Sequence, residues 1–177
     1  MSVYPYRGKR PQIDPTAFVA PGAFILGDVT LGPESSVWFN AVVRADSSAI
    51  TIGARTNVQD CAVLHTDPGV SCAVGDECII GHGAIVHACQ VGRSCLIGMG
   101  AVVLTRAVIG EESLVAAGAL VPEGREHPPR SLLVGSPARV LRTLSDEEVE
   151  TLIRPGIKNY LHYVEGYRQA GLGQSST

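Results

Sequence analysis

Aliphatic side chains recur at intervals of six residues along most of the chain. Six is three times the two-residue period of a β-strand, so the pattern predicts short strands and does not fit a helix of 3.6 residues per turn. Hexapeptide repetition is a sign of a parallel β-helix. The interval between aliphatic positions departs from six residues at three points, and at two of these it is longer because residues are inserted in a turn. The repeating positions are Val19, Ile25, Leu31, Val37, Val43, Ile52, Val58, Leu64, Val74, Ile80, Val86, Val91, Ile97, Val103, Ile109, Val115 and Val121.

The repeat resembles the left-handed β-helix of the hexapeptide-repeat proteins. Three hexads there make one triangular coil, with one strand on each face. A β-sandwich is the alternative, but its strands do not keep a six-residue phase over roughly 100 residues. We therefore expect a mainly β chain in which residues 1–122 form a left-handed parallel β-helix.

The character of the sequence changes after Pro122, where the repeat stops. Residues 123–144 are rich in proline, with Pro128, Pro129 and Pro137 in close succession. Proline lacks a backbone N–H, and it is therefore disfavoured in the interior of helices and sheets. This stretch is therefore expected to be a connector.

The last segment, residues 145–177, has the pattern of a helix. Ser145 and Glu148 have the spacing of a capping box, which marks a helix start. Pro155–Gly156 should break or kink the helix. A coil of strands leaves apolar surface and edges exposed, so we expect this segment to cover them within one structural domain.

Three histidines have a special place in the six-residue phase. His65 and His87 each follow an aliphatic position, and those two positions are three hexads, or one coil, apart. Two imidazoles on neighbouring strands, at a spacing of about 4.8 Å, can meet at one metal with bonds of about 2.1 Å. His82 falls on the preceding face of the coil. We therefore expect His82 to reach the metal from a neighbouring subunit, which threefold symmetry would repeat at three interfaces.

Four further polar residues fall close to these columns. Arg44 continues the column of the two metal-phase histidines, and Asp46 lies two residues later on the same side of its strand. Gln59 precedes Asp60, which lies one coil below His82. A polar row on an apolar repeat is costly unless its members are paired. An Arg44–Asp46 pair, or an Arg44–Asp60 pair between subunits, would meet that need.

Composition narrows the class of protein. The net charge of −3 argues against a generic nucleic-acid binder, which is usually basic. No apolar run approaches the roughly 20 residues that cross a bilayer, and residues 1–11 lack the apolar core of a signal peptide. Five cysteines, an odd number, suggest reduced thiols and a cytoplasmic protein. His127 and His162 lie outside the metal phase and are expected to be packing or surface residues.

The motifs around these polar residues resemble those of the γ-class carbonic anhydrases. The resemblance extends from about Tyr6 to Tyr167, and it is closest to a shorter bacterial branch of the family. The matching segments are Val43-Arg44-Ala45-Asp46, Asn57-Val58-Gln59-Asp60, Leu64-His65, Ile80-Gly81-His82-Gly83-Ala84-Ile85-Val86-His87 and Gly98-Met99-Gly100-Ala101.

The resemblance implies a homotrimeric lyase with a metal at each interface. His65 and His87 of one subunit and His82 of its neighbour would bind Zn(II), with Fe(II) or Co(II) as alternatives. Three histidines leave one metal position open for water, and the implied reaction is the reversible hydration of CO2 to bicarbonate by hydroxide formed there.

The same resemblance implies roles for five other residues. Arg44 and Asp46 would hold the trimer and the site together, and Asp60 would pair with the arginine. Gln59 would orient the reacting water. Tyr163, on the C-terminal helix, would reach towards the site.

The chain departs from the best-studied active form of the family at two places. Ser47 stands where that form has a glutamate, and the segment 66–70 contains no glutamate, with Asp67 as its nearest carboxylate. In the family, this glutamate and the acidic segment are the groups that carry protons to and from the site. A metal-binding trimer with a structural or small-ligand role, such as siderophore binding, is therefore one alternative function. A hexapeptide-repeat acyltransferase, with a histidine as general base, is another.

Overall fold

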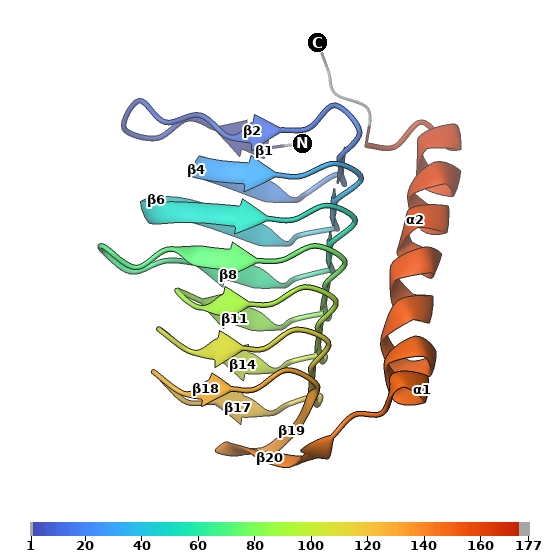
Figure 1. Cartoon of the computed structure of the whole chain (residues 1–177). Helices are drawn as coiled ribbons and strands as arrows, with labels where there is room; N and C mark the ends of the chain where they lie inside the picture. The colour runs from blue at the N-terminus through green and yellow to red at the C-terminus, as the bar shows by residue number, and fades with distance from the viewer. Residues whose placement is uncertain (1, 174–177) are drawn as a thin grey trace.

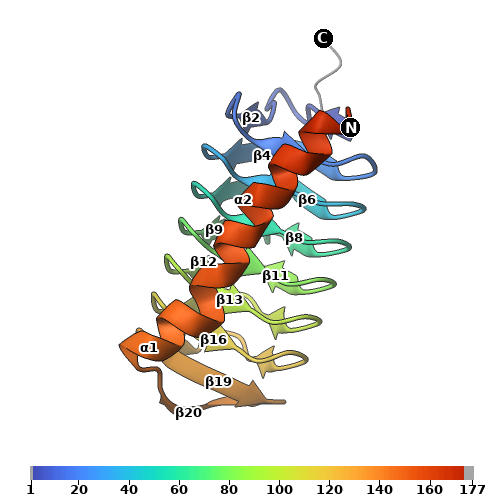
Figure 2. The same ribbon diagram turned by 90° about the vertical axis from the view of Figure 1, so that its right-hand side faces the viewer.

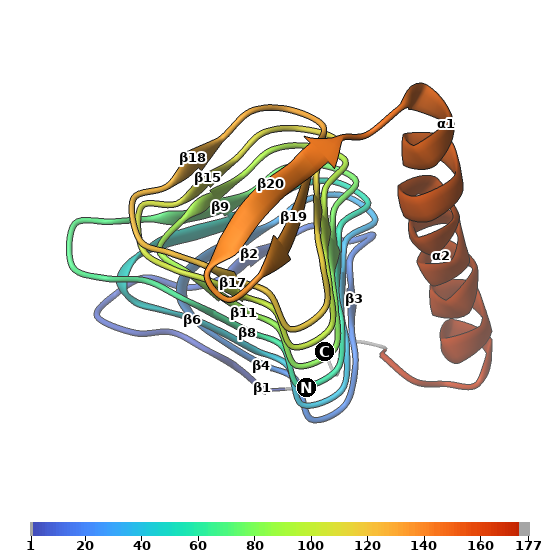
Figure 3. The ribbon, with the colours of Figure 1, turned by 90° about the horizontal axis from the view of Figure 1, so that it is seen from below.

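The computed structural model describes residues 2–173 and shows a stack of triangular coils with a helix along one side (Figure 1). Figure 3, seen along the coil axis, shows the three faces of the prism. The strands within each face run parallel, apart from the last one. The predicted left-handed parallel β-helix is confirmed.

The first face carries the histidine column and is here termed the site face. Its strands pair in parallel from one end of the coil to the other. Two long strands, β4 and β6, bend across a corner and also contribute to the second face. The strands of the site face are β1 (Ser2–Tyr4), β4 (Phe24–Leu31), β6 (Val42–Ile52), β8 (Val63–His65), β11 (Ile85–His87), β14 (Val102–Val103) and β17 (Leu120–Val121).

The other two faces follow the same rule of one strand per coil. The second face adds β2 (Gln12–Ile13), β9 (Cys72–Val74), β12 (Gln90–Val91), β15 (Val108–Ile109) and β18 (Glu126–His127). The third, here the helix face, is made of β3 (Phe18–Val19), β5 (Ser36–Val37), β7 (Asn57–Val58), β10 (Ile79–Ile80), β13 (Leu96–Ile97), β16 (Leu114–Val115), β19 (Ser131–Gly135) and β20 (Ala138–Thr143).

The core is a stack of inward aliphatic side chains, one column for each face. Glycines at the coil corners let neighbouring coils approach closely: a Cβ at Gly53 would lie 2.5 Å from the backbone nitrogen of Asp76. The fixed register therefore gives every coil the same cross-section. The column of the site face is fully buried and consists of Ile25, Val43, Leu64, Val86, Val103 and Val121.

The C-terminal helix packs along the helix face of its own chain (Figure 2). It consists of α1 (Asp146–Glu148), the π-helical turn η1 (Val149–Ile153) and α2 (Arg154–Gln169). The predicted capping box of Ser145 and Glu148 is present. The helical path continues through Pro155–Gly156, because Pro155 lies in the first turn of α2, where a missing N–H costs little. Within the described residues, no helix is both long and apolar enough to cross a membrane.

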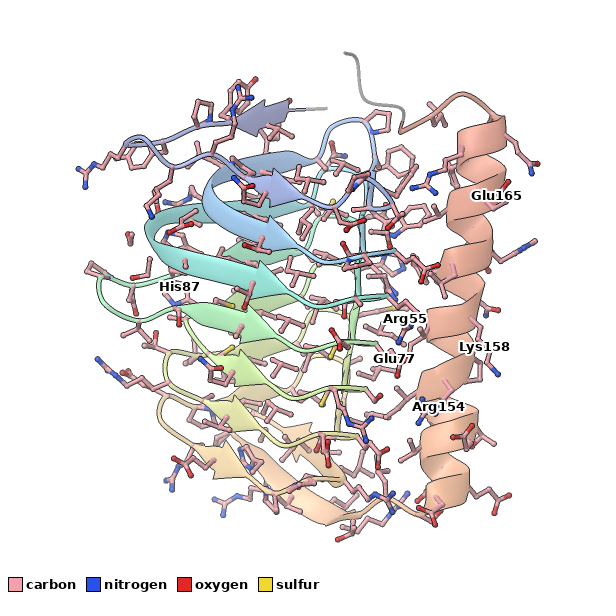
Figure 4. The ribbon with its side chains drawn as sticks, turned by 45° about the horizontal axis from the view of Figure 1, so that its top comes forward. Arg55, Glu77, His87, Arg154, Lys158 and Glu165 are labelled. Carbon is pink, nitrogen blue, oxygen red and sulfur yellow. The ribbon has the colours of Figure 1, made fainter. Side chains whose placement is uncertain are left out.

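Apolar contacts and ion pairs both fix this helix to the coil. Ile153 is fully buried against outward side chains of the helix face, such as Ile79. Arg154 contacts Glu77 at 3.5 Å, and Arg55 donates to the same carboxylate at 2.9 Å (Figure 4). The hydrogen bond from Arg55 holds the pKa of Glu77 below its ordinary value. The coil and the helix thus share one partly buried carboxylate.

The segment 123–144, expected as a connector, carries three strands in the structure. β18 pairs with β15 and extends the second face by one more coil. β19 continues the helix face, and β20 folds back on it as an antiparallel partner that crosses the end of the prism (Figure 3). The prolines lie in the turns between these strands, where a missing N–H is tolerated.

Candidate metal centre

His65 and His87 occupy equivalent positions on adjacent strands of the site face. The two residues are in direct register, and Arg44 continues the same column one coil earlier, as the hexad phase predicts. The Nδ1 atom of His65 lies 3.1 Å from Nε2 of His87. Figure 4 shows His87 on the side of the coil away from α2. Both side chains are partly exposed, so the pair is open to a ligand from outside the chain.

The outer nitrogens of the two rings have hydrogen-bond partners that fix the tautomers. Nε2 of His65 lies 3.0 Å from Oδ1 of Asp46, a carboxylate oxygen that can only accept. Nδ1 of His87 lies 3.1 Å from the Thr105 hydroxyl, which itself donates to Asp67 at 2.7 Å. Each outer nitrogen therefore carries the ring proton. The two inner nitrogens are left as lone pairs that face each other.

Two facing lone pairs cannot bond to each other, so this arrangement suits a cation between them. Two nitrogens bound to one tetrahedral metal at about 2.1 Å are about 3.4 Å apart, close to the separation of the inner nitrogens of His65 and His87. A carboxylate, backbone carbonyl or water on the outer nitrogen is the usual support of a metal-binding histidine, and Asp46 is a support of this kind. The pair therefore fits two of the three ligands of a metal. Within the part of the chain that the structure describes, no group of three His, Cys, Asp or Glu side chains could hold a metal.

Asp46 is the charged support of this pair. Its other oxygen contacts the guanidinium of Arg44, so the intrachain ion pair expected from the sequence is present. Burial raises the pKa of Asp46, but the hydrogen bonds from His65 and Arg44 outweigh it, and the net pKa lies below its ordinary value. Asp46 is therefore an anion at neutral pH and holds the Nε2 proton of His65.

His82 lies apart from this pair, on the turn that follows β10. Its Nδ1 lies 2.7 Å from Oδ2 of Asp60, which confirms the expected relation of these two residues on neighbouring coils. The backbone N–H of Phe39 donates to the other oxygen of Asp60 at 3.2 Å. The side chain of His82 is about two-fifths exposed, at 41 %. The exposed part of the ring can therefore meet a second chain.

Gln59 is held within its own chain, directly beside His82. Its amide nitrogen donates to Asn57 at 3.0 Å, and its carbonyl oxygen accepts the backbone N–H of His82 at 3.2 Å. The residue is almost fully buried. It therefore lies next to the exposed histidine and not next to the His65–His87 pair of the same chain.

Tyr160, on α2, contacts His82 and was not predicted from the sequence. Its hydroxyl lies 3.4 Å from Nε2 of His82, and burial, with the charge of Asp60 as a second cause, raises its pKa to about 12. Tyr163 stacks edge-on against Tyr160 and is half exposed. Tyr160 lies one helical turn before Tyr163, so the spacing could have indicated it. The sequence pattern does not indicate Thr105, because this residue lies in a turn at a corner of the coil and contacts His87 from there.

An apolar stripe runs beside the histidine column on the site face. The outward side chains of its strands are exposed or only partly buried, and Phe24 and Ile85 are 48 % and 40 % exposed. Contiguous exposed apolar surface marks an interaction site in most proteins. The stripe consists of Phe24, Val42, Val63, Ile85, Val102 and Leu120.

Comparison with known proteins gives relatives that span most of the chain. No family model matches. A carbonic anhydrase of Geobacillus kaustophilus is 43 % identical over 86 % of this chain and 84 % of its own length. A protein named "probable carbonic anhydrase" from Methanocaldococcus jannaschii is 46 % identical over 83 % and 90 %. The carnitine operon protein CaiE of Escherichia coli is 42 % identical over 84 % and 76 %.

A solved structure shares the whole fold. A Bacillus cereus protein, provisionally named an acetyltransferase, superposes with a TM-score of 0.92 at 40 % identity, over 96 % of this chain and 98 % of its own. Sequence and fold thus agree on one group of hexapeptide-repeat proteins. The names within that group cover more than one activity.

Proposed function

Because the chain belongs to the γ-class carbonic anhydrase family, we propose that it binds a divalent metal and catalyses the reversible hydration of CO2. The observation that carries this proposal is the His65–His87 pair, whose inner nitrogens face each other at 3.1 Å with both outer nitrogens already bonded. A metal of Zn(II), Fe(II) or Co(II) type accepts imidazole nitrogen in such a site.

The third ligand in this proposal is His82 of the partner subunit. Its support is geometric: His82 projects from a different part of the coil, is partly exposed, and has its Nδ1 proton held by Asp60. The apolar stripe on the site face is a surface that a second copy of this chain can cover. Three copies related by a threefold axis would bury three stripes and complete three metal sites.

The metal, when bound, supplies Lewis acidity that lowers the pKa of a bound water to about 7. The chain's own residues fix the ligands and the nucleophile. Asp46 and Thr105 hold the two rings in the required tautomers. Gln59 lies beside His82 and would come to the site with it, where the amide N–H that is not bonded to Asn57 would orient the water.

Two charged residues and a tyrosine complete the proposed site. Arg44 binds Asp46 within the chain, and its side chain is 45 % exposed, so its other N–H donors would be available to Asp60 of the partner subunit. Tyr163, carried by α2 beside Tyr160, would border the cavity in which CO2 is bound. Asp67, which accepts the Thr105 hydroxyl and is 42 % exposed, would be a nearby carboxylate to take up the proton that the reaction releases.

The proposal is tested by stopped-flow CO2 hydration. The oligomer would be loaded separately with Zn(II) and, without oxygen, with Fe(II), and His87→Ala would serve as the blank. Rates well above the blank with either metal would support a hydratase and would identify the better metal. Rates at the blank level with both metals, at verified occupancy, would contradict it.

A metal-binding trimer without hydratase activity is the second candidate. Ser47, which lies 3.5 Å from Asp46, provides no carboxylate at the position of the family's glutamate, and a relative at 42 % identity is named for a carnitine operon. This role would leave the metal site intact and the CO2 rate at the blank level. An acyltransferase is less well supported, because a single general base would leave the facing His65–His87 pair unexplained.

A further inference from the structure

His127 occupies an inward position of the coil that is aliphatic at every earlier turn. It is in register with Ile109 on the adjacent strand, and the column continues through Val91, Val74 and Ile52, all almost fully buried. An imidazole in this column breaks the pattern that builds the core. A residue that breaks a local rule in this way is often retained for a function.

The ring of His127 has a buried polar atom with no partner. Its Nε2 is the one buried side-chain nitrogen or oxygen atom without a hydrogen bond among the residues that the structure describes. Such an atom lowers the stability of the fold, because on burial it loses its hydrogen bonds to water and gains none within the protein. Burial, and secondarily the charge of Arg125, lower the pKa of His127, which favours the neutral ring.

A cavity of about 310 Å³ opens beside this ring. It lies at one end of the prism, the end that β20 crosses in Figure 3. Arg125, from the turn before β18, and Arg139, from β20, line it together with His127. No carboxylate belongs to the lining, and neither arginine takes part in an ion pair among the described residues. The apolar part of the wall consists of Pro122, Pro137, Ala138 and Val140.

We propose that this cavity binds a small organic anion, a carboxylate or phosphate group carried on a short apolar body. Two guanidinium groups without carboxylate partners suit either head group, since arginine binds both through paired N–H donors. The proline and valine side chains suit an apolar body. The volume is at the small end of the range for ligand pockets, which excludes a large cofactor. This site lies at the far end of the prism from β1 and does not depend on the proposed metal centre.

Isothermal titration calorimetry of the intact oligomer tests the proposal with three probes: benzoate, phenyl phosphate and inorganic phosphate. We expect saturable binding of at least one organic probe. Arg125→Gln combined with Arg139→Gln should weaken that binding about tenfold or more. The matched control combines Arg93→Gln with Arg106→Gln, which removes the same charge from two surface ion pairs and should leave the affinity unchanged. Protein stripped of metal by a chelator should bind equally well, which separates this site from the metal centre.

His127→Leu gives a second, independent readout. Leucine restores the aliphatic column, so the ligand-free melting temperature should rise by about 2–4 °C. Anion binding should weaken, because His127 is one of the polar residues that line the cavity. A fall in melting temperature, or unchanged binding, would show that the ring only packs the coil end. The absence of saturable binding for all three probes, or an equal loss in the control variant, would overturn the proposal.

Discussion

His82 donates its Nδ1 proton to Asp60 across one coil, at 2.7 Å, on a different part of the prism from the His65–His87 pair. One chain therefore holds two imidazoles at one site and a third, oriented by a carboxylate, at another. Such a division is expected of a metal centre that two subunits assemble together.

His82→Ala should abolish metal binding at every site of the oligomer, because each site needs one His82. Elemental analysis of the purified oligomer measures the bound metal, and light scattering measures its mass. His162→Ala, which removes an exposed histidine from α2, is the matched control and should keep full occupancy. Full occupancy in His82→Ala would contradict the intersubunit site.

Asp46→Asn should weaken metal binding by about 10- to 100-fold, the usual cost of losing a supporting group behind a metal-binding histidine. The amide keeps the shape of the side chain but removes the charge that holds the Nε2 proton of His65. Competition with a chelator measures the affinity. Asp28→Asn, on an exposed pair with Lys9, is the control and should change nothing.

Arg44→Ala should weaken the proposed trimer as well as the proposed metal site. The change leaves Asp46 hydrogen-bonded to His65 but without its guanidinium partner on the apolar site face, and a carboxylate whose charge is not balanced is costly to bury between subunits. The mass in solution across a dilution series into the micromolar range checks this. A trimer mass equal to that of wild type throughout the series would count against a role for Arg44 in assembly.

Glu77, which pairs with both the coil and α2, should make the stability of the fold depend on pH. The folded pKa of this carboxyl is lowered, so its contribution is present above its ordinary pKa of 4.5 and is lost as the pH falls through the folded value. Glu77→Gln should reduce the free energy of unfolding by about 1–2 kcal/mol at pH 7 and by less at pH 3. Urea unfolding at both pH values measures this. Equal losses at the two pH values would argue against an ionic contribution, and Glu111→Gln, on an exposed pair, is the control.

The sequence predicted the parts of the fold that depend on counting along the chain. His65 and His87 are in register because three hexads separate their strands, and the same count placed His82 over Asp60. Counting could not find Thr105, which meets His87 from a corner, or Tyr160, whose contact depends on how α2 crosses the coil. The strands of segment 123–144 were missed for a related reason. Its prolines lie in turns between strands, and the inward residue of β18 is a histidine, so the repeat was not followed on to the inward Leu133 of β19.

Ser47→Glu should raise the turnover for CO2 if proton transfer limits the rate. Ser47 follows Asp46 and lies 3.5 Å from its carboxylate, so a longer acidic side chain there begins beside the metal centre and extends towards solvent. A carboxylate so placed can carry the proton that each hydration releases, while the binding of CO2 stays the same. We therefore expect kcat to rise and its dependence on buffer concentration to fall, with the metal content unchanged. Ser47→Gln, which has the same length without a titrating group, should keep the wild-type rate. If the glutamine variant rises as much as the glutamate variant, the effect comes from packing at this position and not from proton transfer.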